Sequence, residues 1–100
     1  MTLLEVCVDD VAGLEAATQG GADRIELCSS LASGGLTPSG GLMAAAARLT
    51  VPVVALIRPR TGGFVYADAE ERVMLRDIDL AMELGLAGVV DWVGHALPQA

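Results

Sequence analysis

The chain has 100 residues, of which 53% are hydrophobic, and this composition is typical of at most one globular domain and excludes a disordered chain. Its formal net charge is −7 and its six basic residues are all arginines, which argues against nucleic acid or an anionic membrane surface as a partner. The longest apolar stretch, Val51 to Ile57, is far shorter than the ~20 residues of a membrane-spanning helix.

The first residues of the chain have the wrong charge for a leader peptide. Glu5 is acidic, and no basic residue precedes Arg24, whereas secretory and mitochondrial leaders are basic. We therefore expect a cytoplasmic protein. In that compartment the two cysteines of the chain are reduced thiols and do not form a disulfide.

Strand and helix signals alternate from the start of the chain. Leu3 to Val8 is predicted as a strand, and the helix after it is capped by Asp9 or Asp10 and ends at Gly20-Gly21. Arg24 to Cys28 is the second predicted strand. After a loop of small residues, Thr37-Pro38 predicts a cap and a first turn for an alanine-rich helix that runs to Leu49.

The second half of the chain continues this alternation. Val51 to Ile57 is predicted as a strand buried on both faces. Asp68 and Glu71 form a capping box for a long amphipathic helix that Gly85 ends, and Leu86 to Val90 begins a fourth strand. The pattern predicts an α/β fold with parallel strands, either a doubly wound sheet or a (β/α) barrel. Because no G-x-G-x-x-G follows the first strand, a dinucleotide-binding fold is disfavoured.

A short motif occurs twice, as Leu3 to Cys7 and as Arg24 to Cys28. Each copy places a carboxylate and a thiol two residues apart, so both side chains point to the same face of a strand. We expect Cys7 and Cys28 at matching ends of neighbouring strands. Because a buried carboxylate is costly unless it is paired, Glu5 and Glu26 indicate that the interior of the fold is functional.

Four separated motifs resemble the amino-terminal half of the CutC family. They are Leu3-Leu4-Glu5-Val6-Cys7, Gly21-Ala22-Asp23-Arg24-Ile25-Glu26-Leu27-Cys28, Gly34-Gly35-Leu36-Thr37-Pro38-Ser39, and Ile57-Arg58-Pro59-Arg60 with Phe64-Val65-Tyr66. The resemblance implies a (β/α)8 barrel of the TIM type and a role in copper homeostasis in the cytoplasm. It implies a partial barrel of about three and a half βα units over residues 1–90, followed by an unmatched tail over residues 91–100.

The resemblance also implies that the chain holds only part of a barrel, since a full family member is roughly twice as long. Three or four parallel strands cannot close a barrel, which leaves an unpaired edge and an uncovered apolar face. We therefore expect self-association. A truncated product without activity remains an open alternative.

Cys7 and Cys28 are the candidate metal ligands. Two thiolates on adjacent strands suit Cu(I), whereas a tetrahedral zinc site needs four ligands. The alternative is that both cysteines are small buried apolar residues, which is the commonest role of a free cysteine. The resemblance to a copper homeostasis family gives similar weight to the copper site and to the buried apolar role.

Arg58 and Arg60 follow the third predicted strand, at the end where barrel active sites are built. They pair with Glu5 and Glu26 across the interior, or they bind a small anionic ligand, or one arginine serves each purpose. The second interpretation makes the chain an enzyme of unknown reaction, with Glu5 and Glu26 as candidate catalytic groups.

Missing residue types narrow the chemistry of such an enzyme. The chain has no lysine, so it cannot form a Schiff base, and its single histidine, His95, lies in the tail and is expected to be a solvated surface residue. Carboxylate chemistry by Glu5 or Glu26 is what remains. Whether the chain is an enzyme stays open at this point.

Overall fold

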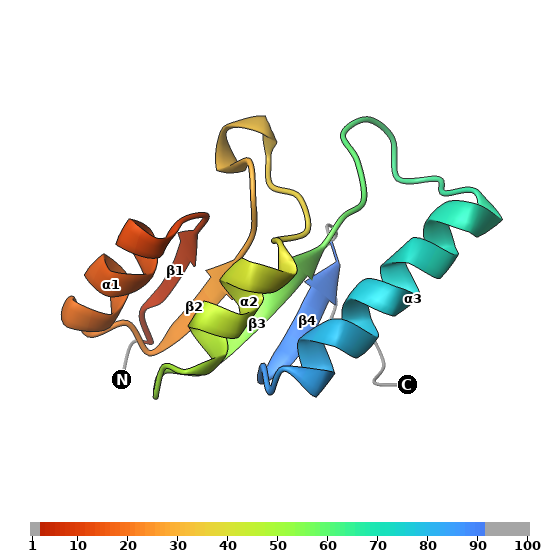
Figure 1. The fold of residues 1–100 in the computed structure, drawn as a ribbon. Helices are drawn as coiled ribbons and strands as arrows, with labels where there is room; N and C mark the ends of the chain where they lie inside the picture. Colours follow the sequence, from red (N-terminus) through yellow and green to blue (C-terminus); the bar gives the residue numbers. More distant parts are fainter. Residues whose placement is uncertain (1–2, 92–100) are drawn as a thin grey trace.

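The computed structural model describes residues 3–91 as four strands, three α-helices and one short 3-10 helix that alternate along the chain (Figure 1). The elements are β1 (Glu5–Val8), α1 (Val11–Gln19), β2 (Arg24–Leu27), η1 (Leu31–Ser33), α2 (Gly40–Ala47), β3 (Val53–Ile57), α3 (Asp68–Glu83) and β4 (Gly88–Asp91). None of these helices is long and apolar enough to cross a membrane. Of the predicted tail, only Asp91 lies within the described residues, and His95 lies outside them.

The strands form one sheet in the order β1-β2-β3-β4, and each strand is parallel to its neighbour. Cys7, Glu26, Val54 and Gly88 lie side by side in one row across this sheet. Helices join successive strands, as parallel pairing requires, because the chain must return to the same end of the sheet. The predicted α/β class with parallel strands is confirmed.

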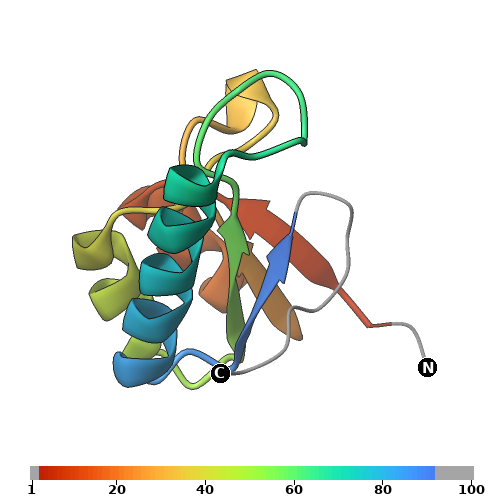
Figure 2. The same ribbon diagram turned by 90° about the vertical axis from the view of Figure 1, so that its right-hand side faces the viewer.

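The three α-helices pack on one face of the sheet (Figure 2). Alternate strand residues such as Ile25, Leu27 and Ala55 point to that face, are fully buried, and pack with Met43 and Ile78 from the helices. No helix among residues 3–91 covers the other face, which we call the open face. It carries Glu5, Cys7, Arg24, Glu26, Val54, Leu56, Gly88 and Val90.

Two predicted helix caps were wrong, and the structure gives the reasons. The cap of α2 is Ser39, whose hydroxyl accepts a hydrogen bond from the Leu42 N–H, because Thr37 is held by another partner. The Thr37 hydroxyl accepts a hydrogen bond from the Arg58 N–H at 2.8 Å and donates one to the Arg58 carbonyl at 3.1 Å. The predicted cap residue therefore fastens the loop before α2 to the end of β3.

The cap of α3 is displaced by one residue from the prediction. It is Ala67, not Asp68, and the Ala67 N–H donates a hydrogen bond to the Glu70 carboxylate at 2.9 Å. The predicted partner Glu71 is exposed. Because Glu70 also binds Arg60, this cap links the helix to the loop that precedes it.

Candidate functional site

The two copies of the repeated motif are not aligned in the sheet. Glu5 lies opposite Arg24, and Cys7 lies opposite Glu26, so the second copy is shifted by two residues relative to the first. The prediction that Cys7 and Cys28 occupy matching strand ends was therefore wrong. The shift has a physical reason, because it places a guanidinium rather than the Glu26 carboxylate beside Glu5.

Glu5 and Arg24 form an ion pair on the open face. The Arg24 Nε donates to Glu5 Oε2 at 2.8 Å, and Nη2 of the same guanidinium contacts the same oxygen. The arginine and glutamate side chains are 53% and 39% exposed, so this pair contributes little stability. Glu5 was expected to be a buried carboxylate, and its exposure corrects that prediction.

Cys7 lies within β1 on the open face and is exposed. Its thiol donates a hydrogen bond to the carboxylate of half-buried Glu26, with 3.5 Å between Sγ and Oε2. Desolvation raises the pKa of the Cys7 thiol, and the negative charges of Glu26 and Glu5 raise it further. The thiol is therefore protonated at neutral pH.

Cys28 directly follows β2, two residues beyond Glu26, where continued strand alternation would give it the orientation of Glu26. It is 1% exposed, and its thiol donates to the Val8 carbonyl at 3.6 Å. Burial raises its pKa to about 11, and the charges of Asp9, Cys7 and Glu26 contribute to this rise. Each of the two thiols is thus held in its neutral form.

A loop packs closely over Cys28. Gly35 has a φ of +91°, and a Cβ placed on it would lie 2.9 Å from Leu56 Cδ2 and 3.7 Å from Cys28 Cβ. Only glycine suits both this backbone conformation and this approach. The loop between β2 and α2 therefore covers the carboxyl end of β2 and shields Cys28 from solvent.

Arg58 directly follows β3 and is 6% exposed. Its Nη1 donates to the carbonyls of Ser33 and Gly35 at 3.3 and 3.0 Å, and its guanidinium lies 5.5 Å from the centre of the Phe64 ring. The side chain therefore connects the loop before α2 to the loop before α3. Figure 1 shows these two loops extending beyond the carboxyl ends of the strands.

Arg60 organises the loop before α3. Its Nε donates to Glu70 at 2.5 Å, and its two terminal nitrogens donate to Glu70 and to the carbonyls of Thr61, Gly63 and Val65. These five bonds occupy the five N–H groups of the guanidinium. Its guanidinium also lies 5.0 Å from the centre of the Tyr66 ring.

Arg58 and Arg60 do not form the predicted ion pairs with Glu5 and Glu26. In residues 3–91, the carboxylate partner of Arg60 is Glu70, and the guanidinium partner of Glu5 is Arg24. Glu70 follows Arg60 by only ten residues and lies in the first turn of α3. This position brings its carboxylate beside the Arg60 guanidinium, which therefore pairs with Glu70. Whether either arginine binds an anion stays a prediction.

Glu70 and Arg24 were not singled out in the sequence. Hydrogen bonding from the Ala67 N–H, followed by that from Arg60, lowers the pKa of Glu70 and keeps it charged. The sequence signal for Glu70 was its position three residues after a helix cap. This signal was missed because the predicted cap, Asp68, lies one residue after the observed cap, Ala67. Arg24 became identifiable as the partner of Glu5 only when the strand register was known.

Residues 3–91 contain no group of three or more His, Cys, Asp or Glu side chains placed to hold a metal ion. A two-coordinate Cu(I) site needs only two thiolate ligands, whereas a structural zinc site needs four ligands.

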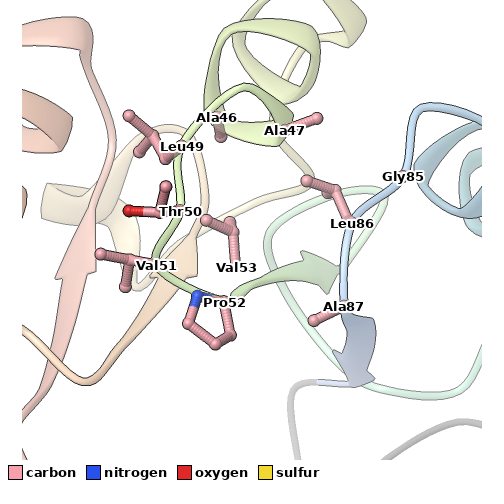
Figure 3. Close-up of a pocket in the computed structure, with 10 residues that line it drawn as sticks. All are labelled: Ala46, Ala47, Leu49, Thr50, Val51, Pro52, Val53, Gly85, Leu86 and Ala87. Carbon is pink, nitrogen blue, oxygen red and sulfur yellow. The ribbon is translucent and has the colours of Figure 1, made fainter.

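A pocket of about 290 Å³ lies at the opposite end of the sheet, before β3 and β4 (Figure 3). The residues that line it include Leu49, Val51, Pro52 and Leu86, and none of its lining residues has a titratable side chain. The amino ends of the strands form the stabilising face of a barrel, whereas catalytic groups lie at the carboxyl ends. This pocket is therefore not a candidate active site.

Known proteins of one family match the chain in sequence and in structure. The model of the CutC family matches residues 2–97. The chain is 68% identical over 88 residues to a family protein CutC of Sinorhizobium medicae and 69% identical over 87 residues to one of Rhizobium meliloti. These alignments cover 88% and 87% of this chain but 36% of each relative, so the chain spans little more than a third of their length.

A crystal structure of a CutC protein from Streptococcus agalactiae matches the fold with a TM-score of 0.83 and 39% sequence identity. The match covers 90% of this chain and 45% of that one, which confirms the predicted partial barrel. The family model reaches residue 97, and the boundary proposed at residue 90 stays a prediction. The match over residues 2–97 and the high identity to its members show that the chain belongs to the CutC family.

Proposed function

We propose that this chain acts in copper homeostasis in the cytoplasm and binds Cu(I) through the thiolates of Cys7 and Cys28. The name of the matching Streptococcus agalactiae protein refers to copper homeostasis. The observation that carries the proposal is the placement of Cys7 within β1 and of Cys28 directly after the neighbouring strand β2. Thiolates are the ligands that Cu(I) prefers, and two of them are enough.

The register of the strands sets the distance that a bridging ion has to span. Cys7 is level with Glu26, and Cys28 follows Glu26 by two residues, so the cysteines are diagonal neighbours. Residues in diagonal positions on neighbouring strands lie roughly 7–8 Å apart, and their Cβ atoms lie somewhat closer. With metal–sulfur bonds of about 2.3 Å, as in zinc thiolate sites, a linear site needs the sulfurs about 4.6 Å apart, and we expect rotation about the Cα–Cβ bonds to bring them to that distance.

The proposed site has to overcome the protonation of both thiols. Cu(I) binding displaces the proton of Cys7 from its hydrogen bond with Glu26 and the proton of Cys28 from the Val8 carbonyl. Because the pKa of each thiol is raised, the apparent affinity for Cu(I) increases with pH over the neutral range. A reducing compartment favours the site, since it keeps both sulfurs available.

Anaerobic titration with Cu(I) against a competing chelator tests this proposal. The chain should bind one ion, and Cys7→Ser and Cys28→Ala should each reduce the affinity at least tenfold, because a single thiolate is a poor site. Met74→Leu is the matched control, since it removes a sulfur from α3 and should leave the affinity unchanged. Circular dichroism establishes that each variant is folded. Unchanged binding by a folded variant that lacks both cysteines would refute the proposal.

A second proposal is an enzyme that acts on a small anionic substrate. It is favoured by the charged side chains of Glu5, Arg24 and Glu26 on the open face, which corresponds to the interior of a closed barrel. Arg58 and Arg60 are the proposed anion-binding groups, although an anion has to displace backbone carbonyls from them. Phosphate should then raise the melting temperature above that in chloride of equal ionic strength, and Arg60→Ala should remove the increase. No increase would exclude this proposal for the chain.

A further inference from the structure

Of the two proposed copper ligands, one is exposed and the other is covered. Cys7 is exposed on β1, whereas Cys28 is buried, so an ion that arrives from solvent meets Cys7 and not Cys28. The cover of Cys28 is the loop over residues 30–35, between β2 and α2. A Cβ placed on Gly35 would lie 3.8 Å from the Cys28 Sγ, so the backbone of this loop packs directly on the thiol. Movement of the loop is therefore the direct route to Cys28.

The covering loop is a compact unit that buries few side chains. Its own backbone bonds hold it together, since the Gly35 N–H donates to the Ser30 carbonyl at 3.1 Å. At its base, the N–H groups of Ser29 and Leu36 each donate to the other residue's carbonyl at 2.8 Å. Residues 30–34 are all exposed. Because so little of the loop is buried, its opening costs less free energy than unfolding of the whole chain.

Side chains from the ends of two other strands hold the loop in place. Arg58, which follows β3, donates from Nη1 to the carbonyls of Ser33 and Gly35 at 3.3 and 3.0 Å. Asp9, which follows β1, accepts a hydrogen bond from the Leu31 N–H at 3.0 Å. The bond from Arg58 to Gly35 is buried, whereas the bond to Asp9 is exposed to solvent. Screening by water weakens the exposed bond, so Arg58 is the stronger of the two contacts.

The closed conformation of the loop is strained at Ser30. Its φ is +49° and its ψ is +52°, in the left-handed region that is unfavourable for an L-residue other than glycine. Such strain persists only where surrounding contacts hold the backbone in place. The bonds from Arg58 and Asp9 supply these contacts, and opening of the loop releases the strain. The loop therefore has a closed state that depends mainly on Arg58.

We propose that residues 30–35 form a gate over Cys28, held closed by Arg58, which opens to admit Cu(I) to the second thiol. Cys7 meets the ion first because it is exposed while the gate is closed. Cys28 completes the site after the gate opens, so opening sets an upper limit to the rate of copper uptake. This inference rests on the proposed copper function, and it adds an order of binding to the two thiols.

Alkylation by iodoacetamide tests the gate without copper. The test uses a Cys7→Ser chain, in which Cys28 is the only thiol. Arg58→Met removes the guanidinium and keeps an apolar side chain. It should raise the alkylation rate of Cys28 by about tenfold or more, because a buried bond from a charged group is lost. Arg72→Met is the control, since Arg72 is exposed on α3, and it should change the rate by less than about twofold.

The dependence of this rate on urea separates opening of the gate from unfolding of the chain. Local opening exposes little surface, so the alkylation rate should stay nearly constant at low urea. Circular dichroism establishes that Arg58→Met is folded. If it is not, Ser30→Gly decides in its place, because glycine relieves the strain of the closed loop and should slow alkylation several-fold. An unchanged rate in the deciding variant, or a rate that follows global unfolding in urea, would overturn the gate.

The kinetics of Cu(I) uptake by the chain with both cysteines provide the second measurement. With Cu(I) in excess, uptake should reach a rate that no longer increases with Cu(I) concentration, and Arg58→Met should raise this limit. Uptake that increases in proportion to Cu(I) throughout would overturn the role of the gate in copper loading. Absence of uptake would refute the copper function alone, because alkylation of Cys28 still decides whether the gate exists.

Discussion

The thiol of Cys7 and the carboxylate of Glu26 lie opposite each other on neighbouring strands, with 3.5 Å between Sγ and Oε2. The thiol is the donor, so the bond exists only while Cys7 is protonated. Ionising Cys7 replaces this bond with repulsion between two negative groups. Because of this geometry, the charge of Glu26 disfavours the thiolate and lowers the reactivity of the exposed Cys7 thiol.

Neutralising Glu26 should make Cys7 more acidic. Burial and the Glu26 charge, in that order, raise the pKa of this thiol, and Glu26→Gln removes the second cause. The pH midpoint for alkylation of Cys7 should therefore move to lower pH, measured in a Cys28→Ala background. Glu15→Gln on the exposed side of α1 should leave the midpoint unchanged. If the midpoint stays in place or rises in Glu26→Gln, the proposed effect of Glu26 on Cys7 is contradicted.

Stability at alkaline pH should depend on Cys28. Its pKa is raised from 9.0 to about 11 in the folded chain, so the folded state holds a proton that the unfolded state releases above pH 9. The stabilisation is complete below pH 9 and is lost as the pH rises toward 11. Cys28→Ala should show a smaller fall in the free energy of unfolding across this range, measured by urea denaturation. If the free energy of unfolding falls equally with pH in the unaltered chain and in Cys28→Ala, the pKa of Cys28 is not raised by folding.

Arg60→Ala should destabilise the loop before α3. It removes the bonds to Glu70 and to three carbonyls, and we expect a loss of about 2 kcal/mol in the free energy of unfolding. Limited proteolysis should show faster cleavage within residues 61–66. Arg72→Ala is the control, because Arg72 is exposed on α3 and its removal should cost less than about 0.5 kcal/mol. Equal losses in the two variants would exclude the organising role of Arg60.

Gly35→Ala should destabilise the chain because of both conformation and contact. Its φ is +91°, which costs an L-residue roughly 1–2 kcal/mol, and the added Cβ meets Leu56 Cδ2 at 2.9 Å. Gly63→Ala is the matched control, since no atom lies within 4 Å of its added Cβ. Chemical denaturation should show a loss for Gly35→Ala and little change for Gly63→Ala. A neutral Gly35→Ala would mean that the loop does not pack on Cys28 as described.

The succession of strands and helices was predictable because each element has its own local signal. Val53–Ile57 is an unbroken apolar run that is buried throughout, and Asp10 caps α1 by accepting a hydrogen bond from the Gly13 N–H at 2.6 Å. The caps of α2 and α3 were not predictable in the same way. Thr37 is committed to the Arg58 backbone, a tertiary contact that no neighbouring residue indicates.

The register of β1 and β2 could not be predicted from the repeated motif. Similarity between the two copies suggested that like residues align, whereas the sheet aligns Glu5 with Arg24. Register depends on pairing across strands and on packing of the helix-covered face, both of which are long-range. The same limit applies to Arg60, whose partner Glu70 was placed by the fold of the loop.

X-ray absorption at the copper edge tests the central claim most directly, because it identifies the atoms bound to the metal. The chain loaded with one equivalent of Cu(I) should show two sulfur neighbours and no oxygen or nitrogen neighbour in the first shell. Cys7→Ser should lose one of these sulfur neighbours or lose the copper. A first shell made of oxygen and nitrogen, or an unchanged spectrum in a folded variant that lacks both cysteines, would contradict the claim that Cys7 and Cys28 hold Cu(I).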